Sequence, residues 1–151
     1  MLKAFANRGC KTRLIDLAGL PADALLARGQ APEVDEAIAA VGESRIVVAA
    51  TPTYRALYTG LLKAFFDLMP QAHLRGKLCV GLQTGIAREH ALAVDYGLRP
   101  LFMSLDGLPL AGIFATDDEF PEGEPVPALV ERVNTVAEDV IGMLAGRVAG
   151  K

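Results

Sequence analysis

Two unbroken apolar runs, each bounded by polar residues, constrain the fold of this chain more than any other feature. Residues 46–50 read Ile-Val-Val-Ala-Ala, and residues 78–82 read Leu-Cys-Val-Gly-Leu. Strands covered on both faces of a parallel sheet have such continuous runs, whereas half-exposed strands alternate apolar and polar residues. Apolar residues at helical spacing separate the two runs, as at Leu61, Leu62 and Phe65. The pattern predicts an α/β fold, in which an open parallel sheet lies between two layers of helices.

Glycine and proline mark the ends of the other expected elements. Gly9 and Gly42 each follow a segment with helical periodicity, and Pro70 closes a third one. The longest expected helix is interrupted near Gly97 and Pro100, because proline removes a backbone donor and kinks a helix. The expected strands are residues 12–17, 46–50, 78–82 and 108–114, the expected helices are residues 2–8, 32–41, 57–68, 88–105 and 129–144, and a loop is expected over residues 18–30.

The composition narrows the class of protein. The 15 Lys and Arg residues against 18 Asp and Glu give a net charge of −3, which argues against a nucleic-acid partner. Charged residues interrupt every apolar segment before the ~18 residues that a membrane helix needs, so no membrane partner is expected. Two cysteines, Cys10 and Cys79, indicate a cytoplasmic location. No Cys or carboxylate lies at metal-binding spacing from His73 or His90, so no metal site is expected. The length of the chain predicts a single domain over residues 1–151.

A first motif follows the apolar run at residues 46–50. Thr51-Pro52-Thr53-Tyr54 precedes Gly60-Leu61-Leu62-Lys63, and the segment resembles the Thr-Pro-x-Tyr signature of the flavodoxin-like NAD(P)H-dependent FMN reductases. The resemblance implies a strand that ends and turns beneath a flavin. The turn at Pro52 can present backbone N–H groups to ring acceptors, and Tyr54 can flank a planar ring. An ordinary turn between a strand and a helix is the alternative interpretation of these four residues.

A second motif follows the apolar run at residues 78–82. Gln83-Thr84-Gly85-Ile86 resembles the Ala-Thr-Gly-Gly turn of the same family, and residues 90–100 resemble the following His-Leu-Leu-Ala-Val-Asp-Tyr-Ala-Leu-Lys-Pro. Ile86 replaces the second glycine, so its side chain restricts the backbone and can crowd the flavin. Thr84 and Gly85 are therefore the better contacts. Because each motif directly follows an apolar strand, the two turns are expected to converge at the carboxyl edge of the parallel sheet. The resemblance extends over nearly the whole chain and is closest to reductases that serve two-component sulfonate monooxygenases.

The resemblance implies a function and a set of cofactors. An enzyme of this kind binds FMN and NAD(P)H, transfers hydride from the nicotinamide to flavin N5, and needs no catalytic acid, base or metal from the protein. Reduced flavin would pass to a partner flavin-dependent monooxygenase. The resemblance also implies a π-bulge at Tyr96. We expect a homo-dimer or homo-tetramer formed through the helix with Asp95 and Tyr96, because Leu92, Tyr96, Phe102 and Met103 give this segment more apolar surface than one sheet face needs. The expected flavin-binding residues are Pro52, Thr53, Tyr54, Thr84, Gly85 and Ile86.

Two alternatives to this function remain open in the sequence. One is a quinone or azo reductase that retains FMN, and the other is a non-catalytic paralogue that keeps only the oligomer surface. Family members begin with a strand and a Ser-rich phosphate loop, and neither is found in this sequence. We therefore expect an N-terminally truncated sheet, with a gap between residues 12–17 and 46–50. We also expect FMN to bind more weakly than it would to a chain extended upstream.

Overall fold

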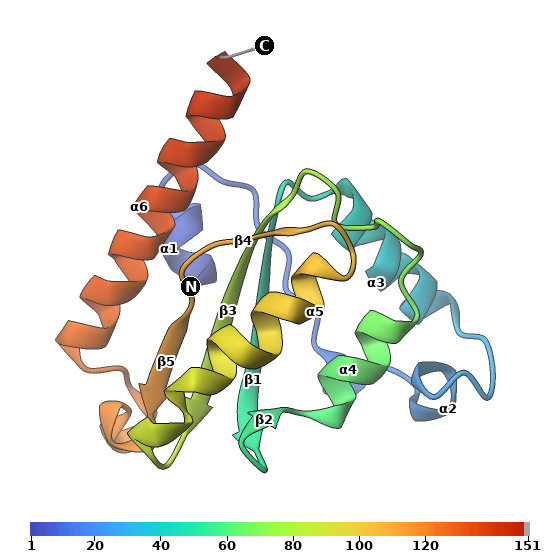
Figure 1. Ribbon diagram of the computed structural model, residues 1–151, viewed down its shortest axis with the longest axis horizontal. Coiled ribbons are helices and arrows are strands. Elements are labelled where there is room, and N and C mark those ends of the chain that lie inside the picture. The colour runs from blue at the N-terminus through green and yellow to red at the C-terminus, as the bar shows by residue number, and fades with distance from the viewer. Residues whose placement is uncertain (150–151) are drawn as a thin grey trace.

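The computed structural model describes residues 1–149, in which helices precede, separate and follow the strands of one sheet. The sheet is built from strands near the middle of the sequence, and the longest helix comes last (Figure 1). The elements are α1 (Leu2–Ala6), η1 (Leu17–Gly19), α2 (Ala22–Leu25), α3 (Pro32–Glu43), β1 (Ile46–Tyr54), β2 (Leu57–Tyr58), α4 (Gly60–Asp67), β3 (Leu78–Gly85), η2 (Arg88–Ala91), η3 (Val94–Leu98), α5 (Arg99–Met103), β4 (Leu108–Pro109), β5 (Ile113–Thr116), η4 (Asp117–Glu119), η5 (Pro121–Gly123) and α6 (Pro127–Ala149).

The sheet is mainly parallel, with β3 at its centre. β1 pairs with β3 in parallel on one side, and both β4 and β5 pair with β3 in parallel on the other. β2 adds a short antiparallel pairing to the end of β1. The predicted α/β fold with a parallel sheet is confirmed, since the two continuous apolar runs form the two central strands.

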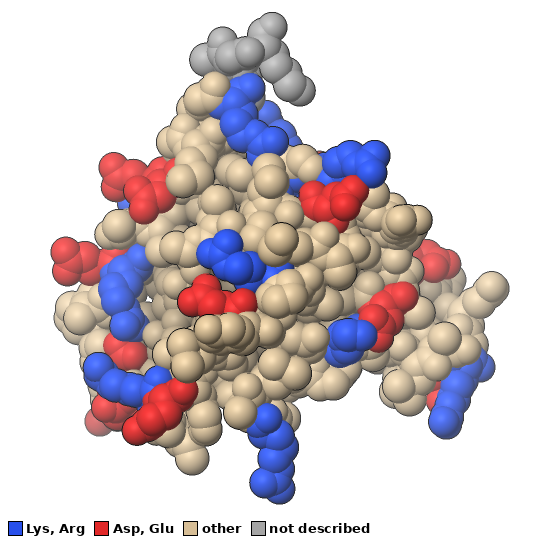
Figure 2. All heavy atoms as spheres, in the orientation of Figure 1, with Lys and Arg blue, Asp and Glu red and all other residues tan. Residues whose placement is uncertain are grey.

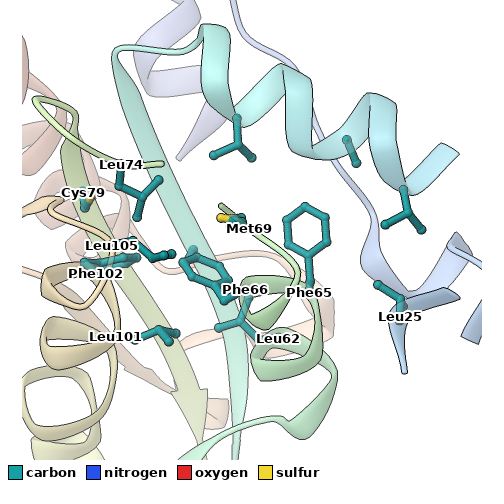
Figure 3. Packing of buried hydrophobic residues seen from close by; sticks show 14 of the residues in the cluster. Leu25, Leu62, Phe65, Phe66, Met69, Leu74, Cys79, Leu101, Phe102 and Leu105 are labelled. Carbon is teal, nitrogen blue, oxygen red and sulfur yellow. The ribbon is translucent and has the colours of Figure 1, made fainter. Parts of the chain in front are cut away.

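Helices cover both faces of the sheet, as the continuous apolar strands predict (Figure 1). One face carries the larger core, in which Phe65 and Phe66 of α4 pack near Phe102 of α5 (Figure 3). On the other face α1 and α6 pack over Leu78 and Val80 of β3. Successive residues of β3 thus point alternately into the two cores. Both faces of the strand are therefore apolar until its carboxyl end.

The strand expected at residues 12–17 is not formed. This segment is extended but has no ladder partner among residues 1–149, and a strand requires one. Ile15 and Leu17 still pack against the larger core. The Asp16 side chain accepts the N–H of Ala18 at 3.0 Å, so the chain turns into η1 instead of continuing as a strand. The loop expected next contains the short helix α2.

Two other expected elements have different boundaries in the structure. The helix expected from residue 57 begins at Gly60, because Leu57 and Tyr58 pair with β1 as a strand. The last expected strand is divided into β4 and β5, and Gly112 lies between them. A Cβ on Gly112 would lie 2.7 Å from the carbonyl oxygen of Gly81, so the backbone approaches β3 too closely there for a side chain.

Among residues 1–149 no helix is both long enough and apolar enough to cross a membrane.

The helix expected over residues 88–105 is divided into three parts. A 3-10 turn (η2) is followed by a π-helical turn (η3) and then by α5. Tyr96 lies inside the π-helical turn, so the predicted π-bulge is confirmed. Phe102, which the sequence suggested as part of an exposed surface, is only 1% exposed and belongs to the core, so that interpretation was wrong.

Candidate functional site

The two predicted motifs lie next to each other at the carboxyl edge of the sheet. Pro52 of β1 pairs with Thr84 of β3 in the parallel ladder. The ends of β1, β3 and β5 point to the same edge, at the bottom of Figure 1. Ligands of open α/β sheets bind beyond the carboxyl ends of the strands, so this edge is where a site is expected. The prediction that the two turns converge is confirmed.

The first motif forms a tight hairpin that projects from the sheet edge. Thr53 pairs with Tyr58, and Tyr54 pairs with Leu57, which leaves a two-residue loop. Both loop residues, Arg55 and Ala56, have positive φ values, of 52° and 63°. A type I′ hairpin turn requires positive φ at both positions, and residues other than glycine adopt it at a cost of strain. The pairing of β1 with β2 therefore holds the two loop residues in this backbone conformation.

A network of threonine hydroxyls anchors the base of this hairpin. Thr51 is buried, and its Oγ1 accepts the N–H of Thr59 at 3.1 Å. The two hydroxyl oxygens are also 3.2 Å apart, within hydrogen-bond distance. The Thr59 hydroxyl in turn accepts the N–H of Leu62 and caps α4. The network fixes both ends of the hairpin to the sheet and to the start of α4.

The second motif packs closely against the first. A Cβ built on Gly85 would lie 3.3 Å from Cβ of Thr53 and 3.2 Å from Cζ of Phe114. These distances are shorter than most contacts of a Cβ atom, so a side chain at residue 85 would press against both neighbours. The side-chain amide of Gln83 donates to Oγ1 of Thr53 at 3.2 Å and links the two motifs directly. The sequence analysis missed Gln83 as a candidate, although a glutamine inside an otherwise apolar strand was the available signal.

Several groups at this edge are exposed and can contact a ligand. The side chain of Tyr54 is 66% exposed and that of Ile86 is 82% exposed. Ile86 therefore points away from the protein and does not fill the turn. Within residues 1–149, the N–H groups of Ile86 and Ala87 donate to no protein acceptor. An aromatic side chain beside free N–H donors suits a planar ring with acceptor atoms along one edge, so these residues fit a flavin.

The ionisable groups near the sheet have structural roles. Burial raises the pKa of the Cys79 thiol to about 12, which makes it unreactive at neutral pH. Glu119, the last residue of η4, accepts the N–H of Thr116 at 3.0 Å in a capping box. This hydrogen bond, with help from Arg132, lowers the pKa of the Glu119 carboxyl from 4.5. Both groups therefore have structural roles, Cys79 in the core and Glu119 in the capping box.

Comparison with known proteins places the chain in one family. Residues 1–121 match the model of the NADPH-dependent FMN reductase family. The chain is 36% identical over 123 residues to an FMN reductase (NADPH) of Escherichia coli, and the match covers 78% of this chain and 64% of that protein. It is 34% identical over 149 residues to an FMN reductase (NADPH) of Pseudomonas putida, with coverage of 93% and 76%.

A solved structure confirms the fold. The apo form of an NADH:FMN oxidoreductase (EMOB) superposes with a TM-score of 0.85 at 32% sequence identity. The superposition covers 92% of this chain and 75% of that one. The chain thus spans about two thirds to three quarters of the length of the proteins it resembles.

Proposed function

The chain belongs to the NADPH-dependent FMN reductase family, and we propose that it catalyses the NAD(P)H-dependent reduction of FMN as a single flavin reductase domain. The observation that carries this proposal is the pairing of Pro52 with Thr84, which brings the two flavin-type motifs to one sheet edge. Two sequence motifs, whose paired residues Pro52 and Thr84 are 32 positions apart, thereby form one surface. The exposed side chains and free N–H groups of that surface suit a flavin ring.

The proposed roles of the residues follow from their positions. Tyr54, on the projecting hairpin, is the side chain available to flank the ring. Pro52 and Thr53 form the end of β1 beneath it, and Thr84 and Gly85 form the adjacent end of β3. Ile86 contributes its free N–H, while its side chain extends towards solvent.

The protein's contribution to the reaction is to hold two planar rings together. FMN, when bound, supplies the acceptor for a hydride from the nicotinamide. The chain's own residues supply the ring contacts at Tyr54 and the backbone donors at Ile86 and Ala87. Because hydride transfer between two such rings needs no protein nucleophile, no catalytic acid or base is assigned.

We propose that reduced FMN leaves the site and serves a flavin-dependent monooxygenase. Tyr54 and Ile86 are both more than half exposed, so the ring contacts that they offer are open to solvent on one side. An open site with few buried contacts favours release, whereas an enzyme that retains FMN would enclose the ring. This feature favours the flavin-supplying function over a quinone or azo reductase.

We also propose that the chain forms a homo-dimer or homo-tetramer through the segment with the π-helical turn. Leu92, directly after η2, Tyr96 of η3 and Met103 of α5 are 63%, 77% and 59% exposed. Figure 2 shows charges of both signs interspersed with broad uncharged areas on the face drawn there. Large apolar side chains that gather on one surface are typical of protein interfaces.

The test of this function is an FMN titration followed by a rate measurement. We expect the chain to bind FMN, to oxidise NADH or NADPH in the presence of excess FMN, and to release the product. Tyr54→Ala should lower FMN affinity by about 3- to 10-fold, because a ring contact is worth roughly 0.5–1.5 kcal/mol. The exposed position of Tyr54 predicts an unchanged melting temperature for this variant.

Three outcomes decide between the functions. Turnover of excess FMN supports a flavin-supplying reductase. FMN that remains bound through purification and passes electrons to quinones would indicate the retaining enzyme. A folded chain with neither FMN binding nor NAD(P)H oxidation would contradict the proposal and indicate a non-catalytic protein.

A further inference from the structure

The row of β3 residues that faces the larger core contains one long polar side chain. Along this face Cys79, Gly81, Gln83 and Gly85 alternate with residues of the opposite face. Gly81 lies against Leu98, where a Cβ would come within 2.8 Å of its Cδ1. Gln83 is therefore located between the packed helix over Gly81 and the flavin-type turn at Gly85.

Gln83 is fully buried and only half satisfied. Its exposed fraction is 0%, its Nε2 donates to Oγ1 of Thr53 at 3.2 Å, and its Oε1 has no hydrogen-bond partner among the described residues. Turning the amide over would leave Nε2 unpartnered instead, so one amide atom lacks a partner in either orientation. A buried polar atom without a partner destabilises a fold. An apolar side chain of the same length would avoid this penalty.

The bond to Thr53 fixes the position of the hairpin relative to β3. Thr53 is the last residue of β1 before Tyr54, and its Cβ packs against Gly85. A hydrogen bond to its hydroxyl selects one rotamer and holds the hairpin base against β3. The neighbouring Thr51 network holds the other side of the same hairpin, so both threonines of this face are fixed.

We propose that Gln83 is a positioning residue for flavin binding, which acts through Thr53 to set the position of Tyr54 relative to the turn at Thr84 and Gly85. This inference rests on the proposed function, since it assumes that the ring is flanked by Tyr54. Gln83 itself is buried and does not touch the ligand. Its effect is therefore expected on affinity and on the hairpin, and not on fold stability.

The main test compares Gln83→Met with the wild-type chain. Methionine has nearly the same length and removes both the bond to Thr53 and the unpartnered atom. We expect a melting temperature equal to or above that of the wild type, together with an FMN affinity lower by about 3- to 10-fold. Amide NMR shifts of residues 53–57 in the FMN-free protein should change as well, which provides a readout that needs no bound flavin.

Thr53→Val is the companion variant, because it removes the accepting hydroxyl and leaves Gln83 in place. It should lower FMN affinity by about the same factor, and the double variant should lose little more than either single variant. Val80→Ala is the matched control: Val80 is 0% exposed, on the same strand, and faces the opposite core. It should lower the melting temperature and leave the FMN affinity unchanged.

The outcomes separate this inference from the proposed function. Absence of FMN binding in the wild type would contradict the proposed function. The NMR shifts of residues 53–57 in Gln83→Met would then still show whether Gln83 positions the hairpin. Wild-type FMN affinity and unchanged shifts in Gln83→Met would overturn the positioning role. A Gln83→Met chain that unfolds would also overturn it, because the amide would then serve stability. Additive losses in the double variant would show that Gln83 does not act through Thr53.

Discussion

The hydroxyl oxygen of Thr51 accepts the backbone N–H of Thr59 at 3.1 Å, which closes the base of the hairpin between β1 and α4. Eight residues separate the two threonines, and the strained turn at Arg55 and Ala56 lies between them. The hydrogen bond therefore joins the end of the central strand to the start of a helix. The conformation of the proposed flavin-contacting hairpin depends on this pair.

Thr51→Val should destabilise the chain by about 1–2 kcal/mol, because it leaves the N–H of Thr59 without its partner. Valine has the same shape, so packing is unaffected. Urea denaturation measures the change. Thr135→Val is the control, because Thr135 is exposed on α6 and its loss should fall within about 0.5 kcal/mol of zero. Equal effects in both variants would show that the Thr51 network contributes no more than a surface hydroxyl.

Gly85→Ala should weaken FMN binding and lower stability by about 1 kcal/mol. The added Cβ would lie 3.2 Å from Cζ of Phe114 and 3.3 Å from Cβ of Thr53, so the Phe114 ring and Thr53 must shift to make room for it. Calorimetric FMN titration and thermal melting measure both effects. Gly142→Ala is the control, since no atom lies within 4 Å of its new Cβ. There alanine should raise stability by about 0.5–1 kcal/mol through its helix propensity.

Tyr96→Asp should shift the chain from an oligomer to a monomer in sedimentation velocity experiments. The substitution places a charge in the centre of the proposed apolar interface, where its desolvation opposes association. Leu14→Asp is the control, because Leu14 is also exposed, at 75%, but lies in the N-terminal segment away from η3. A wild-type monomer at micromolar concentration, or dissociation of both variants alike, would contradict an interface at Tyr96.

The stability of the chain should depend on pH through Glu119. The N–H of Thr116 and the charge of Arg132 lower the pKa of this carboxyl in the folded state from 4.5. The ionised form therefore stabilises the fold above about pH 4.5, and this contribution is lost as pH falls through the lowered pKa. Glu119→Gln should be less stable than the wild type at about pH 7, and the difference should shrink towards about pH 3.

Denaturation at a series of pH values checks this expectation. Glu138→Gln is a suitable control, because the Glu138 side chain is 79% exposed and its nearest cation, on Arg8, is 3.9 Å away. That variant should show little difference from the wild type at any pH. A stability difference for Glu119→Gln that stays constant with pH would show that the charge of the capping box is unimportant.

The sequence by itself determined the central strands and the convergence of the two motifs at one sheet edge. The continuous apolar runs at residues 46–50 and 78–82 formed adjacent parallel strands, because strands of this kind are stable only when both faces are covered. The motifs at Pro52 and Thr84 follow those strands directly. Parallel strands end at the same edge, so the convergence of the motifs could be predicted without a structure.

Only the tertiary structure decided where strand pairing stops and which buried polar groups are hydrogen-bonded to each other. Residues 12–17 have the composition of a strand, but no neighbouring strand pairs with them within residues 1–149. Leu57 and Tyr58 fit a helix by spacing, yet they fold back on β1. The link from Gln83 to Thr53 spans 30 residues and depends on ladder register. Local patterns specify propensity, whereas hydrogen-bond partners distant in sequence are specified by packing of the whole chain.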